Sequence, residues 1–180
     1  SMIDVHIKAA EHTGSWFQEM TPHDIDLARW FFNSDVTHVF ALGGCYSYKE
    51  FEKYHDGDNV FAMMSFKNNA VAFFHSGKTA PHGYHVETEI VGTKGIIRIS
   101  GEPVKNFNTI YSRNGVVKEC IENFQERFAE AFRIEMQEFI DCILENRKPD
   151  VTVYDGTKAT EIANAATHSF AEKKIVELEA

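Results

Sequence analysis

The sequence predicts an α+β domain, in which a mostly antiparallel sheet carries helices packed on one face. Two observations predict this class. Residues 36–120 hold a series of short strand-like segments separated by Gly, Pro or Asn. Helical periodicity then follows over residues 124–146 and 155–173, and one helical segment precedes the series. Strands that come in a run, with helices flanking the run, favour an antiparallel sheet over alternating βαβ units.

Composition limits the classes of function. The chain has 180 residues, which fits one domain spanning residues 1–180. A net charge of -9 argues against nucleic-acid binding and against an anionic membrane surface. No apolar run is long enough to predict a membrane span, and no signal peptide is visible. The odd, widely spaced set of cysteines predicts no disulfide framework and favours a reducing cytoplasm; these are Cys45, Cys120 and Cys142.

The first two elements are predicted from local patterns. Ile3, Val5 and Ile7 alternate with polar residues, so residues 3–9 are predicted to be a strand. A chain that opens inside a strand suggests a fragment of a longer protein. Residues 22–32 are predicted to be a helix, with Thr21 as its N-cap, Pro22 at its first position and Asp24 completing a capping box.

The strand series begins with residues 36–48, in which Gly43-Gly44 predicts a bulge or bend. Residues 60–66 and 70–76 form a hairpin signature, and nearly every position in them is apolar. Both faces of these strands therefore need cover. Helices are expected to pack against one face of the sheet. A second copy of the chain is expected to pack against the other, open face, so the sequence predicts a homo-oligomer. Further strands are predicted at residues 84–91, 95–100, 109–112 and 116–120.

Two helices complete the chain. Residues 124–146 repeat apolar side chains at intervals of three and four, which predicts one long amphipathic helix that ends before Pro149. Residues 155–173 place Ala159, Ala163 and Ala166 on one stripe, where small side chains permit close packing.

The segment QEMTPHDIDLARW, residues 18–30, places a histidine among three acids at a helix start. Free N–H groups there disfavour a proton on His23, so its imidazole is biased toward neutrality and suited to proton transfer. Asp26 lies on the same side of the helix, and Glu19 precedes it. Two interpretations stay open from these residues alone: a structural histidine beside a helix cap, or a proton-handling site.

Other motifs predict no further chemistry. His75, His82 and His85 are the tightest group of histidines, but their spacing lacks the pattern of a metal site. No metal is therefore predicted. Residues 91–95 (VGTKG) are typical of a turn between strands rather than of a phosphate-binding loop, and no motif for a Ser or Cys nucleophile occurs.

Four segments in the same order resemble one family. Residues 19–30 resemble its D-x-x-x-H-D-x-D-x-x-R-W/F segment, and residues 83–95 resemble its G-Y-D-x-x-x-E-V-x-G-x-x-G stretch. Residues 124–135 resemble its F-x-x-R-F-x-x-A-Y-x-x-E helix, and residues 155–163 resemble its closing D-G-x-x-A helix. Together these segments are similar to the C-terminal domain of the glucose–fructose oxidoreductase, inositol dehydrogenase and MocA family, and inositol dehydrogenase-like members are the most similar.

The resemblance implies a large open sheet and a catalytic role for His23, with Glu19 as its acid partner where Asp is usual. It implies that Tyr84 lies near the substrate, with His82 and His85 standing where many members have Tyr and Asp. Asp26 is expected to orient the imidazole. The resemblance also implies an NAD- or NADP-binding Rossmann domain upstream, because no dinucleotide-binding motif occurs within these residues.

The expected activity is hydride transfer between a nicotinamide cofactor and a cyclic polyol or sugar, inositol-like, by the full-length enzyme. The isolated 180 residues are expected to be inactive. One alternative is a stand-alone, non-enzymatic module that dimerises or binds sugar. Another is a family member that acts on a different ligand, such as an imine or an amino sugar.

Overall fold

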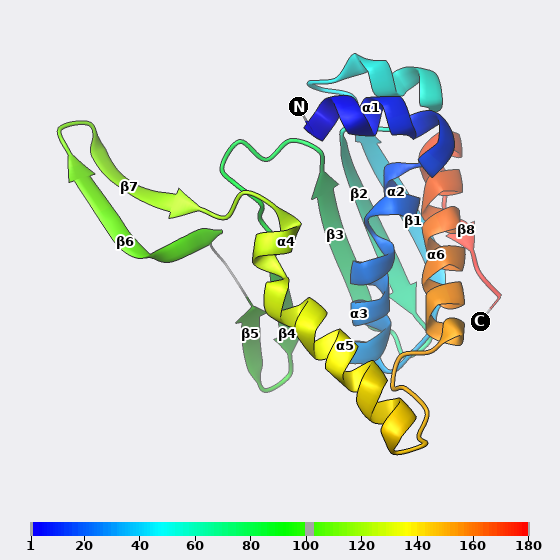
Figure 1. Cartoon of the computed structure of the whole chain (residues 1–180). Helices are drawn as coiled ribbons and strands as arrows, with labels where there is room; N and C mark the ends of the chain where they lie inside the picture. Colours follow the sequence, from blue (N-terminus) through cyan, green and yellow to red (C-terminus); the bar gives the residue numbers. More distant parts are fainter. Residues whose placement is uncertain (1, 100–102, 180) are drawn as a thin grey trace. The chain divides into compact units, whose positions relative to one another are not determined.

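The computed structural model describes residues 2–99 and 103–179. The described residues form two compact units, and each is described by itself below. The first unit combines residues 1–79 with 150–180, and the second comprises residues 80–149. Figure 1 shows the order of the elements along the chain.

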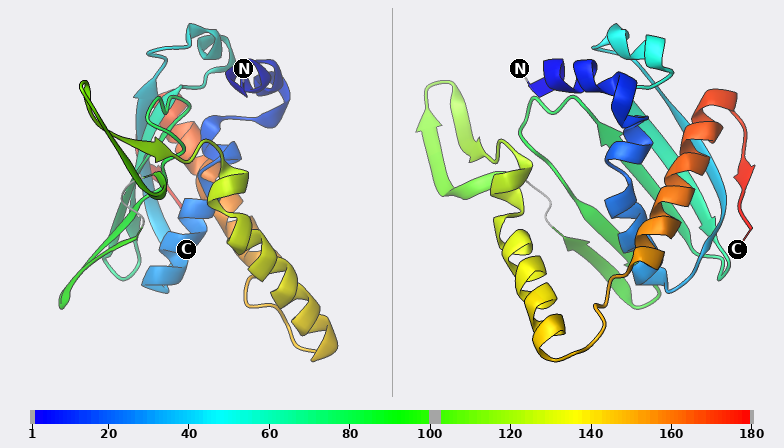
Figure 2. Two further views of the ribbon diagram at one scale, coloured as in Figure 1. Left: turned by 60° about the vertical axis from the view of Figure 1, so that its left-hand side comes forward. Right: turned by 45° about the vertical axis from the view of Figure 1, so that its right-hand side comes forward.

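A four-stranded antiparallel sheet organises the first unit, in the order β3-β2-β1-β8. Its strands are β1 (Val36–Gly44), β2 (Asn59–Phe66), β3 (Val71–Gly77) and β8 (Val176–Glu177). Ala41 of β1 pairs with Ala62 of β2, which pairs in turn with Phe74 of β3. Three helices cover one face of this sheet (Figures 1 and 2); they are α2 (Trp16–Glu19), α3 (Pro22–Phe32) and α6 (Val153–Glu172). The predicted α+β class is confirmed.

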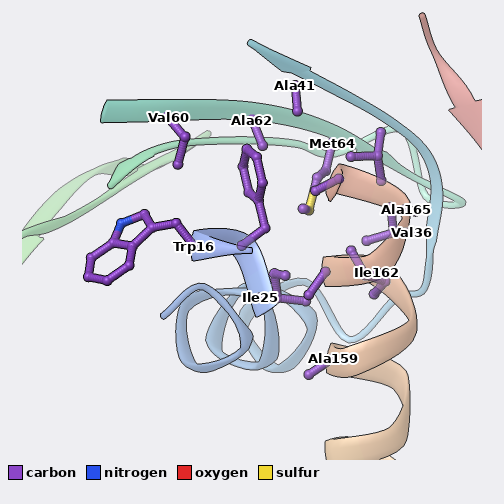
Figure 3. Close-up of a cluster of buried hydrophobic side chains, with 14 of the residues drawn as sticks. Trp16, Ile25, Val36, Ala41, Val60, Ala62, Met64, Ala159, Ile162 and Ala165 are labelled. Carbon is purple, nitrogen blue, oxygen red and sulfur yellow. The ribbon is translucent and has the colours of Figure 1, made fainter. Parts of the chain in front are cut away.

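The core lies between the sheet and these helices (Figure 3). Strand β2 buries every second side chain, as a pleated strand with one covered face requires; these residues are Val60, Ala62, Met64 and Phe66. Phe17 and Ile25 enter from α2 and α3 with no exposed surface. The predicted alanine stripe of α6 is buried against them, so small side chains bring this helix close to the sheet.

The opposite face of the sheet is apolar and exposed. Leu42 of β1, Met63 of β2, and Val71 and Phe73 of β3 expose half or more of their surface. The ring of Phe61 stacks on that of Phe73, with centroids 6.2 Å apart. Both faces of the hairpin are therefore apolar, as the sequence indicates, and the face away from the helices is open within the described residues.

A long loop joins β1 to β2, and a buried carboxylate at its end binds backbone N–H groups at its start. It contains the 3-10 helix η1 (Lys49–Tyr54), and Asp58 at its end is fully buried. Backbone N–H groups of Tyr46, Ser47 and Tyr48 donate to this carboxylate at 3.0, 2.6 and 2.7 Å. Although burial alone would raise the pKa of Asp58, these donors and the amide of Asn59 hold it below its usual value.

Three local predictions are wrong or displaced. Residues 3–9 belong to a helix, α1 (Met2–Thr13), because Ile7 and Ala10 recur at helical spacing and turn inward while Val5 is 64% exposed. Thr21 gives no capping bond to α3, since its hydroxyl donates to the carbonyl of Phe17 at 2.6 Å. The sheet register shifts near Val36 rather than at Gly43-Gly44, where pairing is continuous.

Gly43 has a different role from the one predicted. A Cβ at this position would lie 2.8 Å from the Cα of Val60, and its φ of 157° suits glycine. Close approach of two backbones therefore requires glycine here.

Over residues 80–99 and 103–149, the second unit contains two hairpins and two helices. The hairpins pair β4 (Thr88–Gly92) with β5 (Gly95–Ile99), and β6 (Val104–Ser112) with β7 (Gly115–Cys120). The predicted helix 124–146 is divided into α4 (Phe124–Arg127) and α5 (Ala129–Leu144), because Phe128 leaves the helical conformation with φ −114° and ψ 17°. Among the helices that the structure describes, none is long and apolar enough to span a membrane.

Candidate active site

His23 is the second residue of α3, directly after Pro22 at the first helical position. Its side chain is exposed, while Ile25 is fully buried and fixes which side of the helix faces the core. The adjacent Asp24 is partly buried, and this burial raises the pKa of its carboxyl, an effect that the neighbouring His23 partly opposes. An imidazole that is open to solvent at a helix start is placed to exchange protons with a bound molecule.

Glu19 ends α2, one turn before His23 along the chain. Its carboxylate lies 3.2 Å from Nδ1 of His6 in α1, and both side chains are about three-quarters buried, with 28% and 25% of their surface exposed. The ring of His6 also meets the indole of Trp16 edge-on, with centroids 5.5 Å apart. The predicted acid partner therefore contacts an imidazole, but the contact recorded for it is with His6.

Asp26 belongs to a charge network centred on Arg29. The guanidinium of Arg29 lies 3.6 Å from Asp26, 3.3 Å from Asp35 and 3.6 Å from Asp155, and its side chain is only 10% exposed. Its Nε is buried without a partner among the described residues. Arg29 thus ties α3 to the start of β1 and to the first turn of α6. The orienting role of Asp26 stays a prediction.

Tyr84, His82 and His85 lie together in the second unit. Gly83 has a φ of +107°, and a Cβ there would lie 2.7 Å from that of Cys120, so the turn before Tyr84 requires glycine. The N–H of Tyr84 donates to the carbonyl of Ile121 at 2.7 Å. These contacts fix the backbone on which the three side chains stand.

The two imidazoles of this group contact each other. Nε2 of His82 lies 3.3 Å from Nδ1 of His85, so one ring donates and the other accepts. Nε2 of His85 also lies 3.7 Å from the carboxylate of Glu87. The structure therefore brings His82 into contact with His85, whereas the ring of Tyr84 meets that of Phe128 edge-on. In the first unit, Glu19 contacts His6 and Asp26 contacts Arg29, and neither contact involves His23. The functional roles of all six residues stay predictions.

Sequence reasoning missed two features of the first group. His6 gave no signal, because its segment was assigned to a strand. The network of Arg29 could be predicted from the sequence only in part: Arg29 lies three residues after Asp26 on a helix, a spacing at which two side chains are neighbours. Over residues 2–99 and 103–179, no three His, Cys, Asp or Glu side chains come close enough together to hold a metal ion.

In the first unit, an antiparallel sheet is covered by helices on one face, and the exposed His23 stands at the start of one of these helices. The family model described as "Oxidoreductase family, C-terminal alpha/beta domain" matches residues 8–178. The chain therefore belongs to the glucose–fructose oxidoreductase, inositol dehydrogenase and MocA family.

Named relatives agree with this assignment. Over 94% of its length the chain is 32% identical to scyllo-inositol 2-dehydrogenase (NAD(+)) of Bacillus subtilis, covering 49% of that protein. It is 30% identical to myo-inositol 2-dehydrogenase of Thermotoga maritima, covering 93% of the chain and 50% of the relative. The chain thus spans about half the length of the curated relatives it matches.

Solved structures show the same fold. The crystal structure of scyllo-inositol dehydrogenase from Lactobacillus casei with bound NAD(H) and scyllo-inositol has a TM-score of 0.92 and 37% identity, over 97% of this chain and 52% of that one. Myo-inositol 2-dehydrogenase from Lactobacillus plantarum has a TM-score of 0.93 and 32% identity, over 99% and 53% of the two chains.

Proposed function

We propose that this chain is the substrate-binding and oligomerisation domain of an NAD(P)-dependent dehydrogenase that oxidises a secondary hydroxyl of a cyclic polyol or sugar, inositol-like. The observation that carries the proposal is the exposed imidazole of His23 at the start of α3, in a chain whose relatives are named inositol dehydrogenases. Two relatives of this chain carry names that specify inositol oxidation at one ring carbon.

The chemistry assigned to the chain is proton removal. Nicotinamide, when bound, supplies the acceptor for a hydride from the carbon that carries the hydroxyl. His23 takes the hydroxyl proton, because the ring nitrogen of an imidazole that carries no hydrogen can accept one. We assign to Glu19 and Asp26 the positioning of the imidazole or of its proton, and to Tyr84, His82 and His85 the binding of substrate hydroxyls.

We propose that the dinucleotide, NAD or NADP, is held mainly by residues outside this chain. The strand pairs that the structure describes are all antiparallel, whereas a dinucleotide cradle is built on parallel strands with a glycine-rich turn into a helix. The described residues do not fit the phosphates of the cofactor. The 180 residues alone should therefore bind dinucleotide weakly and turn nothing over.

The test is a substrate panel on the protein encoded by the complete reading frame. Myo-inositol, scyllo-inositol, glucose and an amino sugar are each supplied with NAD+ and with NADP+, and formation of reduced nicotinamide is followed. Inositol labelled with deuterium at the reacting carbon should deliver deuterium to the nicotinamide ring. Absence of turnover with every polyol and sugar would refute the proposal and favour the non-enzymatic module.

We further propose that copies of the chain associate through the open face of the first unit's sheet. Its exposed apolar side chains, with Phe73 63% exposed, form a surface that water does not stabilise. Light scattering should give a multiple of the protomer mass, and Phe73→Arg should lower it. The control is Val5→Arg, in which the replaced side chain is equally exposed on α1. A monomeric wild type, or an unchanged mass for Phe73→Arg, would contradict this proposal.

We propose the reducing cytoplasm as the location, because Cys45, Cys120 and Cys142 form no disulfide bond.

A further inference from the structure

The first unit contains a deeply buried ion pair that the proposed chemistry does not use. Nζ of Lys78 lies 2.6 Å from Oδ2 of Asp56, and the two side chains are only 2% and 3% exposed. Lys78 follows the end of β3, and Asp56 lies in the loop between β1 and β2. Charges this deeply buried are costly unless each is paired and hydrogen-bonded, so such a pair needs an explanation.

The ammonium group is enclosed by aromatic rings. Nζ of Lys78 lies 3.6 Å from the ring centroid of Phe51 and 4.6 Å from that of Trp16. Both rings therefore offer their negative faces to the same cation. Phe51 belongs to η1 and Trp16 to α2, so one ammonium group joins the long loop, the end of β3 and the first residue of α2.

The carboxylate of the pair holds the start of α2. Oδ1 of Asp56 accepts a hydrogen bond from the backbone N–H of Trp16 at 2.9 Å. The indole Nε1–H of Trp16 also donates to the hydroxyl of Ser76 at 2.9 Å. The first N–H groups of a helix have no partner within the helix, so a distant carboxylate here both satisfies a donor and fixes the helix start.

Helix α2 leads directly to the residues of the proposed chemistry. It ends at Glu19, and α3 begins at Pro22 and carries His23. Thr21 between the two helices is fully buried and bonded to Phe17, so a shift of α2 is passed on to α3. The ring of His6, which contacts Glu19, also packs on Trp16.

We propose that Lys78 is a positioning residue: its ion pair with Asp56 clamps Trp16 and thereby sets where Glu19 and His23 lie. The functional meaning of this placement rests on the proposed dehydrogenase activity, but the clamp itself does not. Lys78 acts through Asp56 and Trp16 and contacts no substrate. Loss of the pair should leave the sheet intact and loosen α2 and the start of α3.

The test is NMR spectroscopy of the isotope-labelled chain. Two variants are compared with wild type: Lys78→Met, and a double variant that adds Asp56→Asn and leaves no unpaired buried charge. The control is Lys174→Met, because Lys174 pairs with Glu172 at the surface, where the two side chains are 66% and 50% exposed. The ring protons of His23, the amide of Glu19 and hydrogen exchange along α2 are the readouts.

In the double variant, the His23 ring resonances should shift and amide exchange in α2 should rise about tenfold or more, while amides of paired β1 and β2 keep their protection. Lys174→Met should match wild type. Unchanged His23 resonances and α2 exchange in both variants would overturn the proposal. Global unfolding of the double variant would also overturn it, because the pair would then hold the whole unit rather than α2.

This experiment needs neither cofactor nor substrate. An inactive full-length protein would refute the proposed function and leave the clamp standing, and a negative NMR result would do the reverse.

Discussion

Replacing Asp58 by Asn gives the sharpest test of how the loop between β1 and β2 is held. The carboxylate is fully buried and accepts three backbone N–H bonds of 2.6–3.0 Å, together with one from Asn59 at 3.1 Å. An Asn side chain keeps the shape, removes the charge and turns an NH2 group toward backbone donors. Hydrogen bonds to charged groups contribute about 1.5–3 kcal/mol each and are not additive, so we expect a loss of about 3 kcal/mol in the free energy of unfolding.

Urea unfolding followed by circular dichroism measures this loss, with Asp150→Asn as the control because Asp150 is exposed. The pH dependence has a definite sign. The fold lowers the pKa of Asp58, so its stabilising contribution is complete above the ordinary Asp pKa, about 3.9, and is lost as pH falls through the folded value. The difference between wild type and Asp58→Asn should shrink below about pH 4. A loss below about 0.5 kcal/mol at neutral pH, which is typical of surface sites, would show that the Asp58 carboxylate does not hold this loop.

Two further substitutions test the charges around α3. Burial raises the pKa of Asp24, so its contribution to stability is present below the ordinary Asp pKa and is lost as pH rises through the folded value. Asp24→Asn should therefore increase the free energy of unfolding at neutral pH but leave it unchanged near pH 3. Urea unfolding at the two pH values measures both effects, and an equal effect at both would contradict a raised pKa for Asp24. Arg29→Met leaves three carboxylates without their shared cation and should lower the free energy of unfolding by about 3 kcal/mol. The control Arg133→Met replaces a side chain that is 63% exposed and should change the free energy of unfolding little. Equal losses in the two variants would contradict the role of the network.

The sequence predicted the hairpin of β2 and β3, because uninterrupted apolar runs between turn residues are strong signals for strands. It also predicted α3 and the alanine stripe of α6, where helical spacing is regular over several turns. It failed at residues 3–9, because a short alternation of apolar and polar residues fits one turn of helix as well as a strand, and only packing of Ala10 decides between them.

The candidate site was predicted by residue type rather than by geometry. His23 and Glu19 were found from the helix start and the family resemblance, but neither signal shows which imidazole Glu19 contacts. The contact between Glu19 and His6, and the buried pair of Lys78 and Asp56, join residues that lie 13 and 22 positions apart. Local periodicity contains no information about such pairs, because they form only when separate elements pack together.

The catalytic role proposed for His23 is tested by the turnover of His23→Ala in the protein encoded by the complete reading frame, with inositol and NAD+. His12→Ala is the matched control, since His12 is also an exposed helical histidine. Removal of a general base typically lowers turnover by a factor of about 10² to 10⁴, and we predict a loss in this range for His23→Ala with dinucleotide binding unchanged. Turnover within about twofold of wild type would contradict the assignment of His23 as the group that takes the substrate's proton.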